Sequence, residues 1–259
     1  MDVSAGSPGI PLRELTEHLD GYLRTGEVPD YPGALNGLQV EGDRPVRKVA
    51  SAVDASQATI DAAVREGVDL LLVHHGLFWD GNLPLTGRRY RRVKALLENG
   101  IALYSAHLPL DVHEEVGNNV VLARELGITV EGRFGDYKGH PLGVWGTLEL
   151  RREALAARLD AVLGCRVRLI AGGPERVRRV GVITGGAGGM TSAALEAGLD
   201  AFVTGEGAHH NYFDAAEGGL NLLLGGHYAT EVWGVRELGR RVATEFGLAW
   251  TFLDHPTGL

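Results

Sequence analysis

Histidines recur in this sequence directly after short apolar runs that predict buried strands. His74 and His75 follow the run LLLV, His107 ends the segment IALYSAH, and His227 ends the segment LNLLLGGH. Ligands of open α/β sheets bind beyond the carboxyl ends of the strands. We therefore expect these imidazoles at the functional edges of the predicted sheets.

The adjacent pair His74 and His75 suits binding of one metal ion each. Neighbouring side chains on a strand point to opposite faces, so both reach a single ion only where the strand has ended. Imidazole suits zinc, iron, manganese and nickel alike, so the metal is not identified. A purely structural pair is the alternative, because such pairs also occur by chance.

His227 and Glu231 are four residues apart in the sequence. If the chain turns helical after the strand, the two side chains share one face about 5–6 Å apart. A carboxylate in that position can bridge two ions. The alternative interpretation is an ion pair on the surface of a helix.

Asp111 lies four residues after His107, in the segment HLPLD. Pro109 cannot donate the regular helical hydrogen bond, so we expect Asp111 in a loop where its carboxylate reaches a metal. His107 is then either a ligand or a donor that orients metal-bound water and carboxylates. A solvated histidine is the alternative.

Three histidines and two carboxylates together suit a pair of divalent ions. Two such ions about 3.5–4 Å apart share a bridging hydroxide in many hydrolases. The single cysteine, Cys165, excludes an internal disulfide and a cysteine-rich zinc site, and it fits a reducing cytoplasm. The candidate metal ligands are His74, His75, Asp111, His227 and Glu231.

An internal repeat organises the chain around these residues. Residues 46–75 align without a gap with residues 177–206, shifted by 131 positions, and both copies predict strand, helix, strand. We therefore predict an α/β protein of two related halves, residues 1–128 and 129–259, with mostly parallel sheets and the metal site in the cleft between them. The halves are expected to join within residues 131–143.

The repeat also singles out Glu206, which occupies the position equivalent to His75. We expect Glu206 in the same cleft, where it or His107 moves protons as a catalytic group. An ordinary charge at the start of a helix is the alternative for Glu206.

Periodic leucines predict helices that cover the sheets. Leu12, Leu15, Leu19 and Leu23 form one face of an N-terminal helix, and residues 235–246 predict a terminal helix before a strand at residues 250–253. A further predicted strand and helix are marked by residues 144–150 and by Leu155, Leu159 and Leu163.

Two glycine-containing segments and an arginine run remain. Residues 184–189 (TGGAGG) form either an anion-binding turn or simple tight turns. Residues 36–42 (NGLQVEG) predict a loop that enters a strand, and Asp54 ends the first strand of the repeat; either lies near the cleft without touching metal. The arginine run is interpreted as a solvated helix face, with single-stranded DNA binding as the alternative. Its members are Arg88, Arg89, Arg91 and Arg92.

Composition limits the class of protein. The 259 residues are 44% hydrophobic and 22% charged, which is typical of a folded globular chain. A formal net charge of −8 argues against a dedicated nucleic-acid binder. No apolar run approaches the roughly 18 residues of a membrane span. The first residues lack a basic segment followed by an apolar stretch, so we expect no signal peptide.

Six segments together resemble the Nif-three-like dinuclear-metal proteins, which are often labelled GTP cyclohydrolase I type-2 homologues. The segments are NGLQVEG, VDASQATIDAAVREGVDLLLVHHGLFW, SAHLPLDVHEEVGNN, ITGGAGG, AFVTGEGAHHN and HYATEVWG. The resemblance runs from about Leu35 to the C-terminus. It implies a two-domain α/β subunit in a toroidal homohexamer, without the inserted domain of longer members. It places the family's two metal ions on the same five ligands, with His107 close to them.

The resemblance implies a metal-dependent hydrolase that opens the purine ring of GTP, a small-molecule nucleotide substrate. A phosphoester or an amide is the alternative substrate. A third hypothesis is a non-catalytic metal-binding ring that acts as a scaffold for a protein partner; an acidic chain favours such a partner over DNA.

Overall fold

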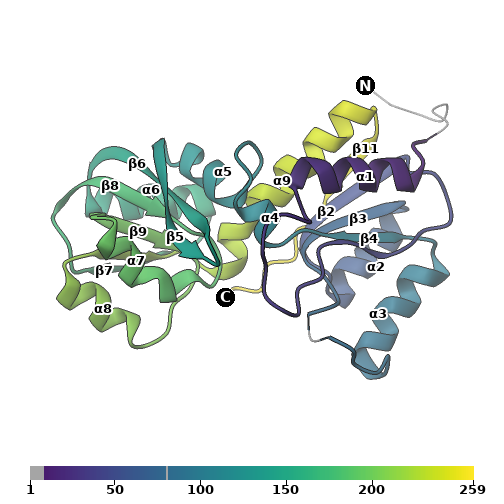
Figure 1. The fold of residues 1–259 in the computed structure, drawn as a ribbon, viewed down its shortest axis with the longest axis horizontal. Helices are drawn as coiled ribbons and strands as arrows, with labels where there is room; N and C mark the ends of the chain where they lie inside the picture. Colours follow the sequence, from purple (N-terminus) through teal and green to yellow (C-terminus); the bar gives the residue numbers. More distant parts are fainter. Residues whose placement is uncertain (1–8, 80) are drawn as a thin grey trace. The chain divides into compact units, whose positions relative to one another are not determined.

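In the computed structural model, which describes residues 9–79 and 81–259, the strands form two separate sheets in two compact units (Figure 1). Unit 1 comprises the chain up to Leu110 together with Val235–His255, and unit 2 comprises Asp111–Gly234 together with Pro256–Leu259. These limits differ from residues 1–128 and 129–259, because residues 111–128 belong to unit 2 and residues 235–255 belong to unit 1. The residues on which the signal-peptide prediction depends include 1–8, which lie outside the described part.

The five-stranded sheet of unit 1 has the order β1-β4-β3-β2-β11. Three of its four strand pairs are parallel, and only β1 runs antiparallel to its neighbour β4. The strands are β1 (Gly37–Val40), β2 (Lys48–Asp54), β3 (Leu70–His75), β4 (Ala102–Ser105) and β11 (Ala249–Phe252). Their parallel core confirms the prediction from the apolar runs of the first half.

Helices of unit 1 bury the apolar faces that the sequence predicts. The helices are α1 (Leu12–Leu23), α2 (Gln57–Glu66), α3 (Gly87–Glu98) and the later part of α9 (His227–Phe246). In α1, the side chains of Leu15, Leu19 and Leu23 are buried as the leucine spacing requires. In α2, the Ser56 hydroxyl accepts a hydrogen bond from the Thr59 N–H and so caps the helix start.

The six-stranded sheet of unit 2 has the order β5-β6-β8-β9-β10-β7. Only β8, β9 and β10 pair in parallel; the other three strand pairs are antiparallel, so this sheet is more mixed than predicted. The strands are β5 (Thr129–Tyr137), β6 (His140–Arg151), β7 (Arg168–Ala171), β8 (Arg176–Val182), β9 (Ala201–Thr204) and β10 (Asn221–Leu224). The predicted junction, residues 131–143, forms most of the hairpin β5–β6.

The helices of unit 2 are short except for α6. They are α4 (Leu108–Asp111, which begins in unit 1), α5 (Asn118–Glu125), α6 (Arg152–Leu163), the 3-10 turn η1 (Ala187–Met190), α7 (Thr191–Glu196), α8 (Asn211–Gly218) and the start of α9. A core of apolar side chains from α5, α6 and the central strands is buried in this unit. No helix in the described residues is long and apolar enough to cross a membrane.

The internal repeat is visible in the structure as two equivalent sets of hydrogen bonds between an aspartate and the backbone at the first strand of each copy. Asp69 Oδ2 accepts hydrogen bonds from the backbone N–H groups of Arg47 and Lys48 at 2.8 and 3.0 Å. At the position 131 residues later, Asp200 Oδ2 accepts from the backbone N–H groups of two consecutive residues, both at 2.8 Å. The mixed α/β fold of two related halves is therefore confirmed.

Two element predictions were wrong at their boundaries. Asp111 ends the one-turn helix α4 instead of lying in a loop, since Pro109 stands at the second helical position, where no backbone donor is required. Helix α9 begins at His227, eight residues before the predicted start at residue 235.

Candidate metal centre

Three histidines of unit 1 gather at the carboxyl ends of adjacent parallel strands. His74 and His75 end β3, and His107 follows β4 by two residues. The ring centroid of His74 lies 4.7 Å from that of His75 and 4.9 Å from that of His107. One ring nitrogen from each of the three residues lies within 4.8 Å of the others. The parallel pairing of β3 with β4 explains this convergence.

Each of these three imidazoles has an oxygen partner at Nδ1. His74 Nδ1 lies 2.9 Å from the Ala106 carbonyl oxygen, and His75 Nδ1 lies 2.9 Å from Asp54 Oδ1. His107 Nδ1 lies 2.8 Å from Asp30 Oδ1. A histidine that binds a metal through one ring nitrogen usually donates the other N–H to a carboxylate or a carbonyl oxygen. Three imidazoles held in this way could bind a metal ion through their other ring nitrogens.

Asp30 fixes His107 from the loop before β1. Its other oxygen, Oδ2, accepts hydrogen bonds from the Asn36 side chain at 2.8 Å and from the Leu108 N–H at 3.1 Å. Asn36 in turn accepts the His107 backbone N–H at 2.8 Å. Burial opposes ionisation of Asp30, but hydrogen bonds from His107 and its other donors outweigh burial and hold the pKa of Asp30 below its ordinary value.

The loop that follows β3 is held against the same histidines. Gln39 accepts the backbone N–H of Leu77 at 2.7 Å, and a side chain on Gly76 would collide with the Gln39 amide. The Trp79 ring centroid lies 4.8 Å from that of His107 and 5.6 Å from that of His75. The segment around Gln39, which the sequence placed near the cleft, thus positions this loop.

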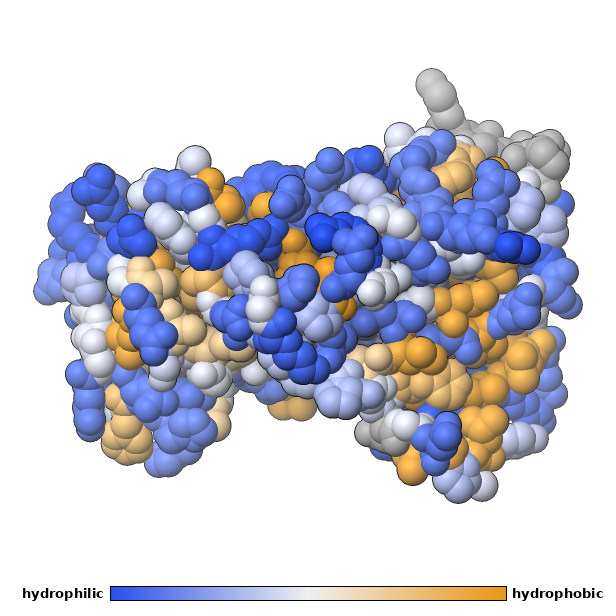
Figure 2. All heavy atoms as spheres, viewed as in Figure 1, coloured by the Kyte–Doolittle hydropathy of each residue, from blue (hydrophilic) through white to orange (hydrophobic). Residues whose placement is uncertain are grey.

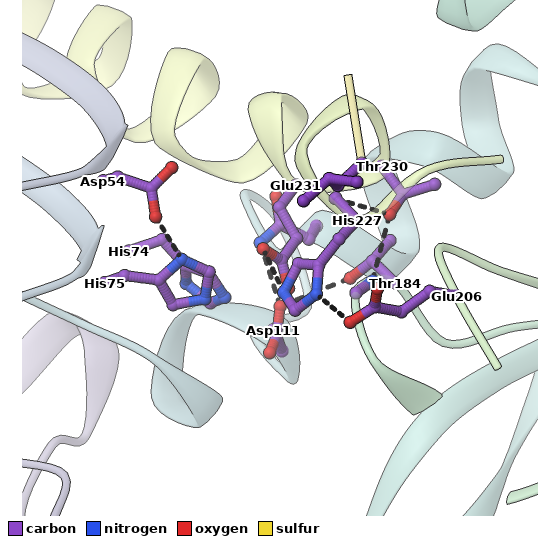
Figure 3. Close-up of polar contacts among 12 residues, drawn as sticks. Asp54, His74, His75, Asp111, Thr184, Glu206, His227, Thr230 and Glu231 are labelled. Atoms are coloured by element: carbon purple, nitrogen blue, oxygen red, sulfur yellow. Dashed lines mark hydrogen bonds and ion pairs between the residues drawn. The ribbon is translucent and has the colours of Figure 1, made fainter. Parts of the chain in front are cut away.

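In unit 2, His227 lies between two carboxylates. Its Nε2 is 3.1 Å from Glu231 Oε2, and its Nδ1 is 2.8 Å from Glu206 Oε1 (Figure 3). The hydrogen bond with Glu231 is the largest influence, and despite opposition from burial the two carboxylates raise the pKa of His227 to about 9. The predicted sharing of one helical face by His227 and Glu231 is confirmed.

Asp111 is buried in unit 2 and is held by two side chains. Its Oδ1 accepts hydrogen bonds from Asn118 Nδ2 at 2.9 Å and from Thr184 Oγ1 at 3.4 Å. Thr184 is followed by Gly185, whose φ is +69° and where an added Cβ would collide with Glu231 Oε1. The glycine-rich turn 184–189 therefore packs against these carboxylates.

The donor types fit one or more divalent ions. Within unit 1 the donors are three imidazoles, and within unit 2 they are one imidazole and two buried carboxylates, a nitrogen and oxygen set that suits zinc, iron, manganese or nickel. A metal ion requires neutral imidazole, so at His227 it would displace the proton that Glu231 and Glu206 stabilise.

All predicted site residues thus fall into two groups. The group in unit 1 is His74, His75 and His107, and the group in unit 2 is Asp111, Glu206, His227 and Glu231. Sequence reasoning missed Asp30, Trp79 and Asn118. Asn118 lies within the quoted segment SAHLPLDVHEEVGNN, but Asp30 lies far from His107 in the sequence and carried no signal.

Comparisons with known proteins agree with the resemblance seen in the sequence. The family model Duf34/NIF3 (NGG1p interacting factor 3) matches residues 11–257. A protein of Deinococcus radiodurans named GTP cyclohydrolase 1 type 2 homolog is 46% identical over 256 residues, covering 98% of this chain and 97% of that protein. A protein of the same name from Escherichia coli K12 is 44% identical over 248 residues, covering 94% and 97%.

A solved structure also matches over nearly the whole chain. The structure of TTHA1606 from Thermus thermophilus has a TM-score of 0.87 and 44% identity, and it covers 95% of this chain and 99% of its own. The fold and the sequence therefore point to one family.

Proposed function

This chain belongs to the Duf34/NIF3 family, and we propose that it is a divalent-metal-dependent hydrolase that acts on a nucleotide. The single observation that carries the metal-binding part is the histidine cluster of unit 1. Its three imidazoles converge within 4.8 Å, and each has an oxygen partner at Nδ1. Histidines that were brought together by chance would not be expected to have an oxygen partner at Nδ1 in all three cases.

We propose that both groups of residues serve one dinuclear centre. His74 and His75 would supply nitrogen ligands from unit 1, and Asp111, His227 and Glu231 would complete the set from unit 2, with Glu231 as the bridging or chelating carboxylate. Two bound divalent ions would lower the pKa of a shared water towards neutrality and so supply hydroxide.

The remaining side chains then have separate tasks. His107, held by Asp30, would accept or return a proton at its second ring nitrogen. Glu206 would do the same beside His227, to which it is hydrogen-bonded at 2.8 Å. Trp79 would limit water access to the histidine cluster, because its ring packs against His75 and His107.

The nucleotide part of the proposal comes from the relatives. Those described above are named GTP cyclohydrolase 1 type 2 homolog, a name that implies ring opening of a purine nucleotide. Formate is the product that distinguishes this reaction from attack on a phosphoester, which releases phosphate.

Metal analysis and an activity assay test the two parts separately. Metal content of the purified protein is measured by mass spectrometry for wild type, His74→Ala and the matched control His210→Ala, whose histidine is exposed in unit 2. We expect about two ions per subunit in wild type and in the control, and a clear loss in His74→Ala. Equal metal content in all three proteins would refute the centre.

The same proteins are then incubated with GTP and with a panel of phosphoesters and amides. Formate release that falls with metal content supports the cyclohydrolase activity. Release of phosphate or of an amine supports the alternative hydrolases. Metal binding without turnover of any substrate would favour the hypothesis of a non-catalytic metal-binding ring.

We also propose a homo-oligomer, a hexamer in view of the family resemblance, in a reducing compartment such as the cytoplasm. Apolar side chains gather on the surface of unit 1 around α2 and α3 (Figure 2), where Leu83, Leu85 and Leu97 are at least half exposed. Exposed apolar groups of this kind suit contact with another copy of the chain. Light scattering after size exclusion measures the assembly, and a monomer at micromolar concentration would contradict it.

A further inference from the structure

Four arginines stand in the first two turns of α3, and these two turns contain no carboxylate. They are Arg88, Arg89, Arg91 and Arg92. The first turn of α3 contains no acidic residue, and its N-cap residue Thr86 makes no side-chain capping bond. The positive end of a helix disfavours cations, and like charges three or four residues apart repel each other. The start of α3 therefore carries an excess of positive charge that a bound anion would stabilise.

Three of the four side chains share one face of the helix. Arg88 and Arg92 are separated by four positions, and Arg89 and Arg92 by three, so their side chains are neighbours on the helix surface. Among the described residues none of these three forms an ion pair, and the Nε atoms of Arg89 and Arg92 are buried without a hydrogen-bond partner. Burial, followed by the charge of Arg88, lowers the pKa of Arg92.

This face of α3 connects to the histidine cluster within unit 1 by two routes. The Asp54 carboxylate, which bonds His75 Nδ1, is close enough to Arg92 to favour its charged form. The Arg89 guanidinium lies over the Phe78 ring at 5.0 Å. Phe78 directly precedes Trp79, whose ring packs against His75.

We propose that Arg88, Arg89 and Arg92 bind the phosphate chain of a nucleoside triphosphate whose base lies at the histidine cluster. This inference rests on the proposed function, since it names the part of the substrate that the metal ligands do not hold. Planar guanidinium groups match phosphate oxygens with two parallel hydrogen bonds, so three of them suit an oligophosphate. The net charge of −8 disfavours a long polyanion such as nucleic acid and leaves a small one as the occupant.

Isothermal titration of the full-length protein, treated with EDTA, tests this binding without depending on metal or turnover. The probes are GTP, tripolyphosphate and guanosine at low ionic strength. We expect GTP and tripolyphosphate to bind, and guanosine to bind at least about tenfold more weakly than GTP. This factor corresponds to the loss of one charge-assisted hydrogen bond.

Three variants make the test specific to this face. We expect Arg89→Gln/Arg92→Gln to weaken GTP binding by about tenfold or more and to leave guanosine binding unchanged. Arg92→Lys keeps the charge but loses the planar fork, so a smaller loss is expected. The control Arg65→Gln removes an exposed arginine from the neighbouring helix α2 and should bind GTP like wild type.

Several results would overturn the proposal. These are unchanged GTP binding by the double variant, absence of tripolyphosphate binding by wild type, and tighter binding of a twelve-nucleotide single-stranded DNA than of GTP. A thermal melt checks folding, and relief of repulsion should keep the double variant at least as stable as wild type. If the untreated wild-type protein takes up no divalent metal while GTP binding is still lost in the double variant, the proposed function is refuted and this proposal stands.

Discussion

His107 Nδ1 lies 2.8 Å from Oδ1 of Asp30, whose side chain is only 5% exposed. The same oxygen also accepts the Tyr31 N–H at 2.7 Å, and Asn36 and Leu108 donate to the other oxygen. A single buried carboxylate therefore joins the loop before β1 to the end of β4. It sets the orientation of the imidazole that faces His74 and His75.

Asp30→Asn should destabilise the metal-free protein at pH 7 by about 1–3 kcal/mol, because a buried charge-assisted network loses its charge. The pKa of Asp30 is lowered in the folded state, so this stabilisation is present above the unfolded pKa of about 3.9 and is lost as pH falls through the folded value. Urea denaturation at pH 7 and at pH 3 measures the difference, which should shrink at pH 3 because this pH lies below the unfolded pKa.

The control for this measurement is Glu27→Gln, which alters an exposed carboxylate that pairs with nearby Arg24. Its effect should be below about 1 kcal/mol. An Asp30→Asn protein as stable as this control would mean that the network around His107 contributes nothing to folding.

His227 should titrate near pH 9 in the metal-free protein. Because this folded pKa lies above the unfolded value of about 6.5, the stability gained from protonated His227 is complete below pH 6.5 and is lost as pH rises through 9. NMR titration of the imidazole measures the pKa directly. Glu231→Gln should lower it more than Glu206→Gln, since the hydrogen bond with Glu231 is the larger cause.

A His227 pKa near 6.5 in the wild-type protein would contradict the geometry described for unit 2. Addition of zinc provides a second check on the same signal. If His227 is a ligand, zinc binding should release its proton and remove the titration between about pH 7 and 10.

Gly185→Ala should destabilise the protein by about 2 kcal/mol or more. The residue has a φ of +69°, which costs a side chain about 1–2 kcal/mol, and its Cβ would collide with Glu231 Oε1. Displacement of Glu231 should also lower the His227 pKa in the same variant. The matched control is Gly189→Ala in η1, where a Cβ meets nothing within 4 Å and φ is not positive.

Urea denaturation and the imidazole titration give two independent measurements of this substitution. Equal stability of the two alanine variants would show that the turn around Gly185 adapts easily. Such a result would remove the reason for glycine at that position.

The parts of this molecule that sequence predicts are those that depend on local periodicity. The leucine spacing predicts α1, and the apolar runs predict β3 and β4, so the convergence of His75 and His107 follows from parallel pairing alone. The role of Asp30 is different, because it acts across 77 residues of chain on His107 and no spacing rule covers such a contact.

The boundaries of helices α4 and α9 were predicted less well, because they too depend on more than the spacing of residues along the chain. Pro109 disfavours a helix interior but is well tolerated in a first turn, so the sequence alone does not distinguish a loop at Asp111 from the observed helix α4. Helix α9 starts directly after Gly226, whose φ of +92° places this residue outside the helical region.

The repeat predicts that Asp69 and Asp200 have the same structural task. Each accepts two consecutive backbone N–H groups at the start of the first strand of its repeat copy, β2 or β8. Replacement of either by alanine leaves two donors without their partner and should cost about 1–3 kcal/mol. Asp69→Ala should cost more than Asp200→Ala, because Asp69 also pairs with Arg44 at 2.7 Å.

Hydrogen exchange with peptide resolution localises these effects. Asp69→Ala should increase exchange in β2, and Asp200→Ala in β8, while Asp61→Ala, which removes an exposed carboxylate from α2, should change neither strand. Loss of protection confined to the matching strand indicates that each copy of the repeat is stabilised by its own aspartate. Unchanged exchange in β8 with Asp200→Ala would show that the hydrogen bonds accepted by Asp200 do not stabilise this strand. The hydrogen bonding shared by the two copies would then not contribute to the stability of the second copy.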